Sequence, residues 1–516
     1  MLNTLQKRNH DYLIFLVVLL LPMLPVSASA EEVATASVLS PYPRADIAVP
    51  VPRSLDLAEA FPLERQAVLP ALGPDDTVRH TENPPVIGRV FPQQLATACD
   101  GVWTQLKDGG RLWTLELASP NAESLRVRFE PFRPPLGAEL ILYNADDARE
   151  AYGPFTAADA HAGFPFWAPT VFGRRVRVEY YLPSAVDPAS PRAALTITGI
   201  LQNFPMPREL LERSGCRLDA SCYPGWETEM AAVAHIRFVE GGESYVCSGA
   251  MVTRTVADFD PLFLTAGHCV SSDEVAATVE VYWLFQSETC DGSVPPLGSV
   301  PRTNWSTHLT TDSDADCTLL GLNAAEIPGD IAWAGWSSGE APNPSLASMI
   351  HHPLGMRKSY SWGTLLGIED ISQCFGTAYD TYDFELLDGG QDGGSSGAPV
   401  FTQSDHLIRA VATCSESDEC IPDEDTGEGA LCYAFDRLSE YLAARSVVYV
   451  WRNTPCDPAD EDGSLTCPWN SLLEGYYGVL GGGTIVIFGG TYPPMTFDGV
   501  RGMTVQAHSG TVVIGE

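Results

Sequence analysis

Gly393-Gly394-Ser395-Ser396-Gly397-Ala398-Pro399 places a serine between glycines, immediately before an apolar stretch. Two earlier stretches accompany it. Leu264-Thr265-Ala266-Gly267-His268-Cys269 ends an apolar run on a histidine, and Asp314-Ala315-Asp316-Cys317-Thr318-Leu319-Leu320 leads from acidic residues into an apolar segment. Taken singly, a glycine-rich loop, a histidine before a cysteine and an aspartate before a strand are ordinary structural features. Their combination in one block of the chain points to chemistry.

The three stretches supply the groups that turn a serine into a nucleophile. A serine hydroxyl reacts poorly unless a neutral imidazole takes its proton and a buried carboxylate orients that imidazole. We therefore predict His268 as general base, Asp316 as the orienting carboxylate and Ser396 as the nucleophile. The surrounding glycines would let the amides of Gly394 and Ser396 converge on one point and stabilise an oxyanion. The order histidine, aspartate, serine is that of chymotrypsin, and the nucleophile elbow of the α/β-hydrolases fails because Ala398 stands where it needs glycine.

Length and composition indicate a folded, multidomain protein built of short strands. The chain has 516 residues, of which 45% are hydrophobic, with 45 glycines and 40 prolines. This length favours about three domains, and the many turn residues favour β-structure over long helices. Because 30 basic and 66 acidic residues give a net charge of −36, the chain repels phosphate backbones, and we expect no nucleic-acid partner.

The first thirty residues have the pattern of a secretory signal peptide. Lys7 and Arg8 precede an apolar run from Leu13 to Val26, and Ala28-Ser29-Ala30 is a small-residue cleavage site. The run is short for a membrane span, which needs about 20 residues, and an uncleaved anchor is the alternative. The 13 cysteines, ten of them between residues 216 and 432, agree with an oxidising compartment. We expect a secreted protein, extracellular or periplasmic, with no membrane contact after signal cleavage.

Composition divides the remaining chain into five segments. Residues 31–98, rich in proline and alanine, predict an extended leader segment, and the alternating short runs of 99–204 predict a β-sandwich. Residues 205–214 predict a linker, and the cysteine-rich 215–445 predicts a mostly β block that ends in a helix over 435–445. Residues 446–516 hold short strands with glycine corners, typical of one or two rungs of a β-helix. A solenoid this short cannot bury its own core, so it should dock on the 215–445 block or stack on a partner.

The three motifs resemble those of the chymotrypsin-like (trypsin-fold) serine proteases. Val281-Tyr282-Trp283, Trp333-Ala334-Gly335-Trp336 and Ile350-His351-His352-Pro353 further resemble the secreted bacterial lysyl-endopeptidase-like branch of that family. The resemblance covers 215–445 and implies an all-β fold of two six-stranded β-barrels with the triad between them. More weakly, residues 99–204 are similar to the strand-rich propeptides of such proteases.

The resemblance also implies disulfides. These are Cys247–Cys269, Cys216–Cys420 and Cys222–Cys290. From proximity in the sequence we further expect Cys414–Cys432 and Cys456–Cys467. Cys317, which follows Asp316 on a buried strand, is expected to stay a free thiol. Since 13 is odd, at least one thiol is unpaired within the chain.

Departures from the family leave the cleavage preference open. Ser395 stands where trypsin has the aspartate that pairs with the new N-terminus, so activation must work differently, through removal of the propeptide. Gly390 stands where trypsin keeps its specificity acid, and the corresponding position of lysyl endopeptidases falls near Gly429, next to Glu428. The candidate specificity-pocket residues are Gly390, Asp392, Thr413 and Glu428, with Asp388 as a further source of negative charge.

Neither a metal nor another cofactor is expected. The acidic run from Ser415 to Glu428 fits no calcium-loop pattern, and we interpret it as a solvated loop. We interpret His351-His352 as a structural pair at a strand end rather than as metal ligands.

The sequence thus predicts a secreted serine endopeptidase that is made as a preproprotein and hydrolyses protein or peptide substrates through an acyl-enzyme on Ser396. Two alternatives are a catalytically silent protease-like binding module and an esterase with the same triad. Through the tail at residues 446–516, we expect contact with a surface or a polymer. The linker contains Arg208 and Arg213 but no lysine, so we expect a mature N-terminus at Ser214.

Overall fold

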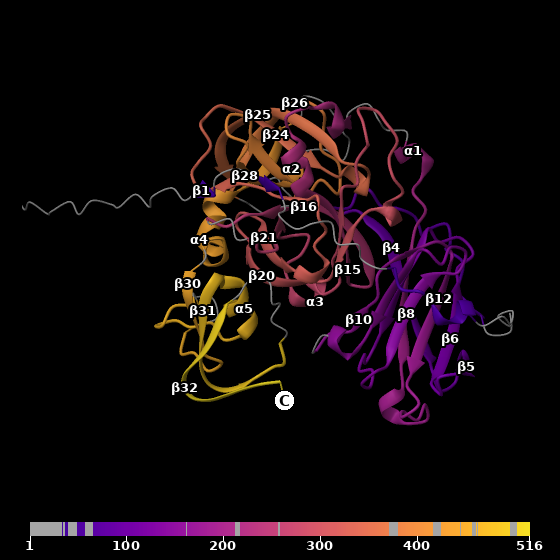
Figure 1. Ribbon diagram of the computed structural model, residues 1–516. Coiled ribbons are helices and arrows are strands. Elements are labelled where there is room, and N and C mark those ends of the chain that lie inside the picture. Colours follow the sequence, from indigo (N-terminus) through magenta and orange to yellow (C-terminus); the bar gives the residue numbers. More distant parts are fainter. Residues whose placement is uncertain are drawn as a thin grey trace, which may run out of the picture. The chain divides into compact units, whose positions relative to one another are not determined.

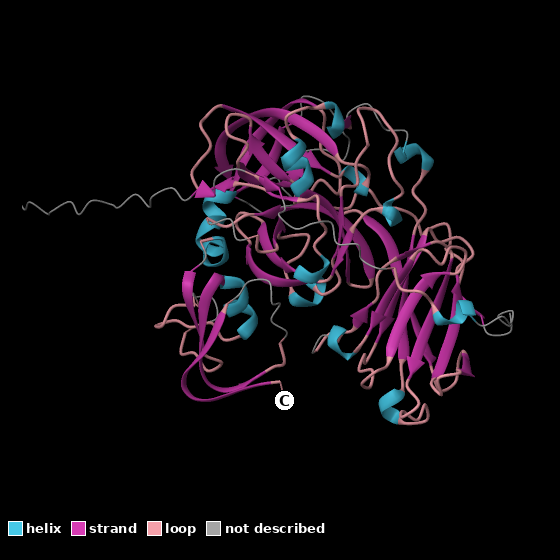
Figure 2. Ribbon diagram, viewed as in Figure 1, coloured by secondary structure: helices cyan, strands magenta, loops and turns pink. Residues whose placement is uncertain are grey.

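The fold consists mainly of strands, with a few short helices (Figures 1 and 2). The computed structural model describes residues 33–34, 37–39, 49–56, 66–160, 163–211, 217–255, 259–370, 380–415, 425–443, 445–456, 461, 463–495 and 503–515. The predicted signal peptide, most of the acidic run before Glu428, and the cysteines Cys216 and Cys420 lie outside the described residues.

The later half of the predicted protease block is a closed six-stranded barrel. Each strand pairs with the next around the ring, and the last, β27, pairs back to the first, β24. The strands in ring order are β24 (Ser345–His351), β25 (Ser359–Asp370), β26 (Asp380–Asp388), β29 (Asp425–Ala430), β28 (Ile408–Ser415) and β27 (Pro399–Thr402). The ring encloses Met349, Leu365, Phe384 and Val400, all fully buried.

The earlier half forms a second curved antiparallel sheet. Its order is β18 (Glu280–Trp283), β15 (Val233–Glu240), β16 (Glu243–Val252), β17 (Leu262–Ala266), β21 (Cys317–Leu322) and β20 (Ser306–Asp312). A short strand, β19 (Arg302–Asn304), pairs with β18 and is separated from β20 only by Trp305, whose φ is 48°. Because β19 leads directly into β20, the two edges of this sheet are brought together. The all-β, chymotrypsin-like fold class is therefore confirmed, with one closed barrel and one half-barrel.

Short helices and edge strands surround the barrels. They are β14 (Leu218–Asp219), α2 (Glu227–Ala232), α3 (Asp273–Ala276), β22 (Ala332–Trp333), β23 (Trp336–Ser337) and α4 (Leu431–Leu442). Leader strands β1 (Val33–Ala34) and β2 (Val38–Leu39) pair with β23 and β22. The helix α4 starts four residues before the predicted Phe435, because Leu431, Ala434, Leu438 and Leu442 form one buried face at helical spacing.

Residues 66–204 form the predicted β-sandwich. One sheet has six strands: β3 (Gln66–Val68), β5 (Val102–Gln105), β6 (Arg111–Ala118), β8 (Glu139–Asn144), β9 (Ala151–Phe155) and β12 (Arg175–Leu182). The facing strands are β4 (Val86–Ala96), β7 (Ser124–Phe129), β10 (Phe166–Trp167), β11 (Val171–Phe172) and β13 (Thr196–Asn203). The sheets begin before residue 99, contrary to expectation. Strand β4 was not predicted because it contains Pro92, a residue that is rare inside strands. The proline lies opposite Gly199, where the register between β4 and β13 shifts.

Strand β4 also joins the sandwich to the protease block, because Gly88 and Val86 pair with Ser244 and Tyr245 of β16. The linker beyond the sandwich includes one helical turn, α1 (Arg208–Leu211).

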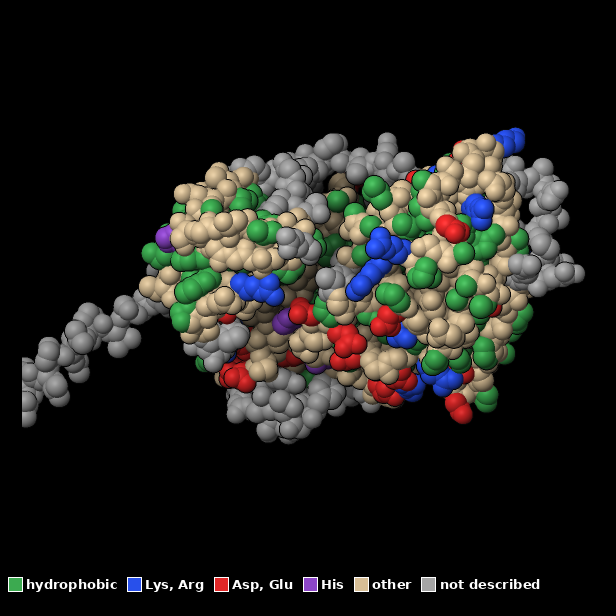
Figure 3. All heavy atoms as spheres, turned by 90° about the horizontal axis from the view of Figure 1, so that it is seen from below, with side chains coloured by type: hydrophobic (Ala, Val, Ile, Leu, Met, Phe, Trp, Pro, Cys, Tyr) green, Lys and Arg blue, Asp and Glu red, His purple; other side chains and the backbone are tan. Residues whose placement is uncertain are grey.

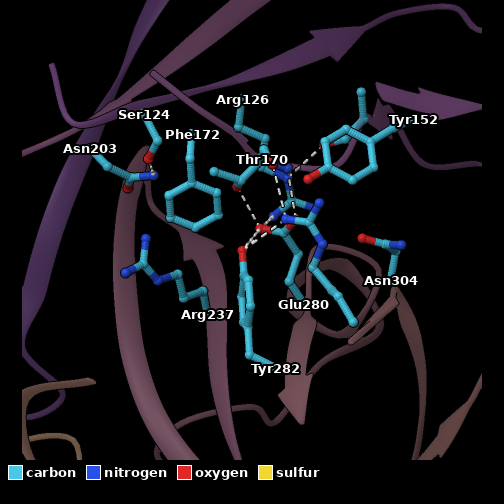
Figure 4. Close-up of polar contacts among 12 residues, drawn as sticks. Ser124, Arg126, Tyr152, Thr170, Phe172, Asn203, Arg237, Glu280, Tyr282 and Asn304 are labelled. Atoms are coloured by element: carbon cyan, nitrogen blue, oxygen red, sulfur yellow. Dashed lines mark hydrogen bonds and ion pairs between the residues drawn. The ribbon is translucent and has the colours of Figure 1, made fainter. Parts of the chain in front are cut away.

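A buried polar network reinforces this junction. Figure 4 shows Arg126, Thr170 and Tyr282 converging on the carboxylate of Glu280. Thr170 donates to Glu280 from its amide (2.7 Å) and hydroxyl (2.6 Å), and Arg126 of the sandwich approaches it to 3.6 Å. Arg302 of the protease block donates from the other side at 3.1 Å. Burial opposes ionisation of Glu280, yet the two guanidinium groups and the Thr170 bonds outweigh it, so its pKa lies below the usual value.

The tail is a three-stranded parallel sheet that docks on the protease block. Its strands are β30 (Arg445–Val450), β31 (Val479–Tyr492) and β32 (Thr504–Ile514), with α5 (Leu472–Gly478) before β31. The buried Arg254 of the block donates to the carbonyls of Tyr477 and Val479, and Trp469 stacks on Tyr441 of α4. Of the two expectations for the tail, docking on the block is the one observed.

Three predicted disulfides are present: Cys222–Cys290, Cys247–Cys269 and Cys456–Cys467. The expected Cys414–Cys432 bond is wrong, because Cys432 is a free thiol whereas Cys414 is disulfide-bonded elsewhere. The prediction from sequence proximity failed because Cys432 lies in the first turn of α4, whereas Cys414 lies on β28. Cys317 is free and buried, as expected.

Charged and hydrophobic side chains are distributed unevenly on the surface. On the face in Figure 3, acidic side chains gather near the centre and hydrophobic ones form small scattered groups. None of the helices in the described ranges is long and apolar enough to cross a membrane.

Removing the Glu280 carboxylate should destabilise the chain strongly. Glu280→Ala would leave Arg126 and Arg302 buried without their shared counter-charge, and we expect the free energy of unfolding to fall by about 3–5 kcal/mol. The measurement is urea unfolding of the whole chain in a Ser396→Ala background. Asp147→Ala, which removes an exposed ion pair with Arg149, is the control and should change nothing measurable. Equal effects of the two variants would contradict a buried network.

Candidate active site

The histidine and aspartate motifs meet where β17 and β21 lie side by side. His268 follows the end of β17, and Asp316 precedes β21. The Asp316 carboxylate accepts from His268 Nδ1 (2.7 Å) with one oxygen and from the His268 amide (2.8 Å) with the other. The Gly267 amide donates to the Asp316 carbonyl at 2.9 Å. These three contacts fix both the position and the orientation of the imidazole.

The two acids of the aspartate motif, Asp316 and Asp314, lie in different surroundings. Asp316 is 2% exposed and has a left-handed φ of 51°, which turns its side chain back toward His268. Asp314, two residues earlier, is exposed. The disulfide Cys247–Cys269 ties the residue after His268 to β16, so the histidine turn is held from both sides.

Ser396 lies in the loop between β26 and β27 and comes from the other barrel. Gly394 and Gly397 have φ values of 91° and 84°, and a Cβ on Gly397 would lie 2.3 Å from the Ser248 carbonyl. The loop therefore needs glycine at both positions.

The carbonyls of this loop face into the protein. The Leu354 amide binds the Gly393 carbonyl at 2.6 Å, and the Ala398 amide binds the Ser395 carbonyl at 2.9 Å. Because a trans peptide directs its N–H opposite to its C=O, the amides of Gly394 and Ser396 point the other way. This is the arrangement expected for an oxyanion hole at these two residues.

Sequence reasoning missed the contact made by the nucleophile itself. The Ser396 hydroxyl donates to Asn83 Oδ1 at 2.9 Å. Around this contact, the segment before β4 packs on the loop: a Cβ on Gly393 would lie 2.5 Å from Pro85 and 3.0 Å from the His80 carbonyl. No local motif marks Asn83, since only the docking of β4 on β16 brings it to the serine.

The four specificity-pocket candidates differ in their surroundings. Gly390 is buried and exchanges hydrogen bonds with Ser361, and Thr413 accepts from the Gly429 amide. The carboxylate of Asp392 forms an ion pair with the guanidinium of Arg217 at 2.7 Å. Glu428 is completely buried and accepts from Gln391 and Thr426. Burial raises the pKa of Glu428 to about 8.

Within the described ranges, neither Asp388 nor the pair His351 and His352 belongs to a group of side chains close enough to bind a metal jointly. Asp388 is exposed, and His351 and His352 are both fully buried. Among the described residues, two groups of side chains lie close enough to bind a metal jointly, and each contains a disulfide-bonded cysteine pair.

Comparison with known proteins agrees with this geometry. The family model described as lysyl endopeptidase, C-terminal domain, matches residues 211–424, and the lysyl endopeptidase N-terminal domain matches residues 87–197. The chain is a lysyl-endopeptidase-like serine protease. The first matched region contains His268, Asp316 and Ser396, the second contains most of the sandwich, and together they cover well over half of the chain.

Individual relatives of this protease are distant. A lysyl endopeptidase of Pseudomonas aeruginosa is 26% identical over 319 residues, which are 58% of this chain and 67% of that protein. The secreted RxLR effector protein 73 of Plasmopara viticola is 24% identical over 204 residues, which are 38% of this chain and 48% of that protein. Among solved structures, the active form of the Rv3671c protease from M. tuberculosis has 14% identity and a TM-score of 0.32. The matched region covers 43% of this chain and 87% of the Rv3671c chain.

Two neighbouring acids provide a direct test of the catalytic register. Asp316→Asn should lower kcat by about 10⁴-fold, because the amide cannot hold His268 in the tautomer that accepts the serine proton. Asp314→Asn changes the same chemical group at an exposed position and should leave kcat unchanged. Peptide hydrolysis by the two purified, processed variants measures both effects. A large loss in Asp314→Asn alone would place the aspartate register two residues too late.

Proposed function

We propose that this protease is a secreted endopeptidase, made as a preproprotein, that cleaves protein chains after basic residues. The observation that carries the reaction type is the bidentate contact of Asp316 with His268. The serine loop packs against the strand end before that histidine, since a Cβ on Gly397 would lie 3.0 Å from the Ala266 amide. In the reaction, the Ser396 hydroxyl attacks the scissile carbonyl while its proton passes to His268 Nε2. The amides of Gly394 and Ser396 stabilise the oxyanion, and His268 then protonates the leaving amine. Water hydrolyses the resulting acyl-enzyme by the same steps.

The preproprotein form is supported by the contacts of residues 80–85. The Ser396 hydroxyl donates its proton to Asn83, and the same proton would have to pass to His268 in the reaction. Pro85 and the His80 carbonyl lie against Gly393, where a substrate would have to pass to reach the serine. The sandwich holds this segment in place through β4–β16 pairing and the Glu280 network. Separation of residues up to 213 from the barrels would remove the obstruction.

Export is supported by the disulfides and by the signal-like N-terminus. Three disulfides in the described residues fit an oxidising compartment outside the cytosol. Lys7, Arg8 and the following apolar run supply the targeting pattern.

Glu428 is the acid best placed to select a basic residue. Asp392 is paired with Arg217 and Asp388 is exposed, whereas Glu428 lies buried beside Gln391, five residues before the nucleophile. One of its carboxylate oxygens, Oε2, has no hydrogen-bond partner within the described residues. A buried carboxyl with a free oxygen can accept a lysine ammonium or an arginine guanidinium directly or through water.

Processing and active-site labelling test the proposal together. The wild-type chain should yield a mature form beginning at Ser214, after Arg213, that reacts with a fluorophosphonate at Ser396 and cleaves casein. Ser396→Ala should not react, and retention of Arg213–Ser214 would show self-processing. Mass-spectrometric N-terminal sequencing and labelling give the readouts. A mature wild-type form that is unlabelled would favour the silent binding module, and hydrolysis of simple esters without casein or peptides would favour the esterase.

The pH dependence of KM tests the role of Glu428. A cationic side chain binds best to the ionised carboxylate, and the pKa near 8 leaves Glu428 mostly protonated at pH 6.5. KM for a substrate with lysine or arginine before the scissile bond should therefore fall as pH rises from 6.5 to 9. Glu428→Gln should raise this KM and abolish its pH dependence, while Glu385→Gln, at an exposed site on β26, should do neither. Retained dependence in Glu428→Gln would assign selectivity to another acid.

A further inference from the structure

The loop between β26 and β27, which carries the Gly394 and Ser396 amides, must be held in a fixed shape, and trypsin holds the corresponding loop by a different contact. In trypsin an aspartate precedes the nucleophile and pairs with the new N-terminus, but here that position is Ser395, which is 1% exposed. Its hydroxyl cannot form an ion pair. Another contact must therefore hold the loop in the shape in which the Gly394 and Ser396 amides point to the oxyanion.

His351, the last residue of β24, contacts this serine. Its Nδ1 lies 2.7 Å from Ser395 Oγ, and its Nε2 lies 3.1 Å from Ser361 Oγ on β25. Ser361 in turn exchanges hydrogen bonds with the backbone of Gly390 at 3.0 and 3.2 Å. The imidazole therefore joins both ends of the loop, Gly390 and Ser395, to the barrel.

The protons in this chain can be assigned so that each hydrogen bond has one donor. The Asp392 amide donates to Ser395 Oγ at 3.2 Å, so the Ser395 hydroxyl is available to donate to His351 Nδ1. His351 Nε2–H then donates to Ser361 Oγ, whose hydroxyl donates to the Gly390 carbonyl. This assignment requires a neutral imidazole. His351 is completely buried, and burial, together with the charge of Arg217, lowers its pKa to about 3.

The middle of the loop is held by a second contact. Arg217 donates to Asp392 Oδ2 at 2.7 Å, with both side chains almost fully buried. Asp392 Oδ1 accepts from the Gly393 amide, and the Asp392 carbonyl accepts from the Ser395 amide. Arg217 follows the predicted cleavage site by only a few residues, so it stays with the protease after processing.

We infer that His351 is a positioning residue of the oxyanion hole, holding Ser395 and Gly390 so that the Gly394 and Ser396 amides face the reacting carbonyl. The inference rests on the proposed serine-protease function. In this arrangement the oxyanion hole does not depend on insertion of a new N-terminus, because a buried histidine and a serine replace the ion pair. Cleavage of the linker then serves to release the segment around Asn83 rather than to build the oxyanion hole.

The test compares processed His351→Ala and Ser395→Ala enzymes with the processed wild type. Each variant breaks the same hydrogen bond, and we expect each to lower kcat by about 10²-fold, within the range for lost oxyanion-hole donors, with little change in KM. The double variant should lose little more than either single one, because both remove one interaction. His351→Asn places an amide oxygen near the former Nδ1 and should recover part of kcat.

A peptide aldehyde separates positioning from general damage. The aldehyde forms a tetrahedral adduct that uses the oxyanion hole, whereas the product peptide does not, so only the aldehyde should bind about 10²-fold more weakly to His351→Ala. Ser348→Ala is the control, since it removes a buried hydrogen bond on the same strand β24 with Tyr360 instead of the loop. It should leave kcat and aldehyde binding unchanged.

The outcomes distinguish this inference from the proposed function. Unchanged kcat and aldehyde affinity in folded His351→Ala, or equal losses in Ser348→Ala, would overturn the role of His351. Additive losses in the His351→Ala/Ser395→Ala double variant would overturn the shared contact. Absence of peptide hydrolysis and fluorophosphonate labelling in the processed wild type would instead overturn the proposed function.

Discussion

Ser248, on β16, joins the two halves of the candidate active site. Its amide donates to the Ser396 carbonyl and its hydroxyl to the Gly394 carbonyl, both at 2.8 Å. Its own carbonyl accepts from Thr265 on β17, the strand that ends in the histidine turn. A single buried residue thus sets the nucleophile loop of one barrel against the histidine strand of the other. The preceding residue, Cys247, forms the disulfide with Cys269, which follows His268. The same short segment of β16 therefore also anchors the histidine turn. Catalysis across two barrels requires such a rigid link, since displacements of about 1 Å at the reacting groups are costly.

The sandwich acts on this centre through three kinds of contact that differ in physical character. The β4–β16 pairing supplies directional backbone hydrogen bonds, the Glu280 network supplies buried charge pairing, and Asn83 reaches the nucleophile itself. Backbone pairing alone would allow register slippage, whereas Glu280 between Arg126 and Arg302 defines one arrangement, because any shift would leave charges buried and unpaired. The segment around Asn83 is thus held at Ser396 by contacts that the sandwich makes elsewhere with the protease block.

The tail illustrates how much the environment of a short element matters. The tail shares its core with the protease block, because Trp469, Tyr477 and Val479 belong to the same buried cluster as that block. Arg254 fixes the attachment by donating to two tail carbonyls from a completely buried position. Strand β32 is mostly exposed along its length. The tail therefore depends on the enzyme for its stability and leaves its outer strand accessible.

The contact between Asp316 and His268 could be anticipated from two local motifs, and the resemblance to the trypsin-fold proteases supplied the fold class and the disulfide Cys247–Cys269. A serine among glycines, a histidine after an apolar strand and an aspartate before another have fixed roles once they occur in that order. The contacts of Asp392, His351 and Asn83 were decided only by the tertiary structure. Each depends on a partner far away in the chain: Arg217 for Asp392, Ser395 for His351 and Ser396 for Asn83. The physical reason is that burial changes what a polar group does. A carboxylate or imidazole that would be solvated on a loop becomes an ion-pair partner or a neutral hydrogen-bonding link once packing removes water from it.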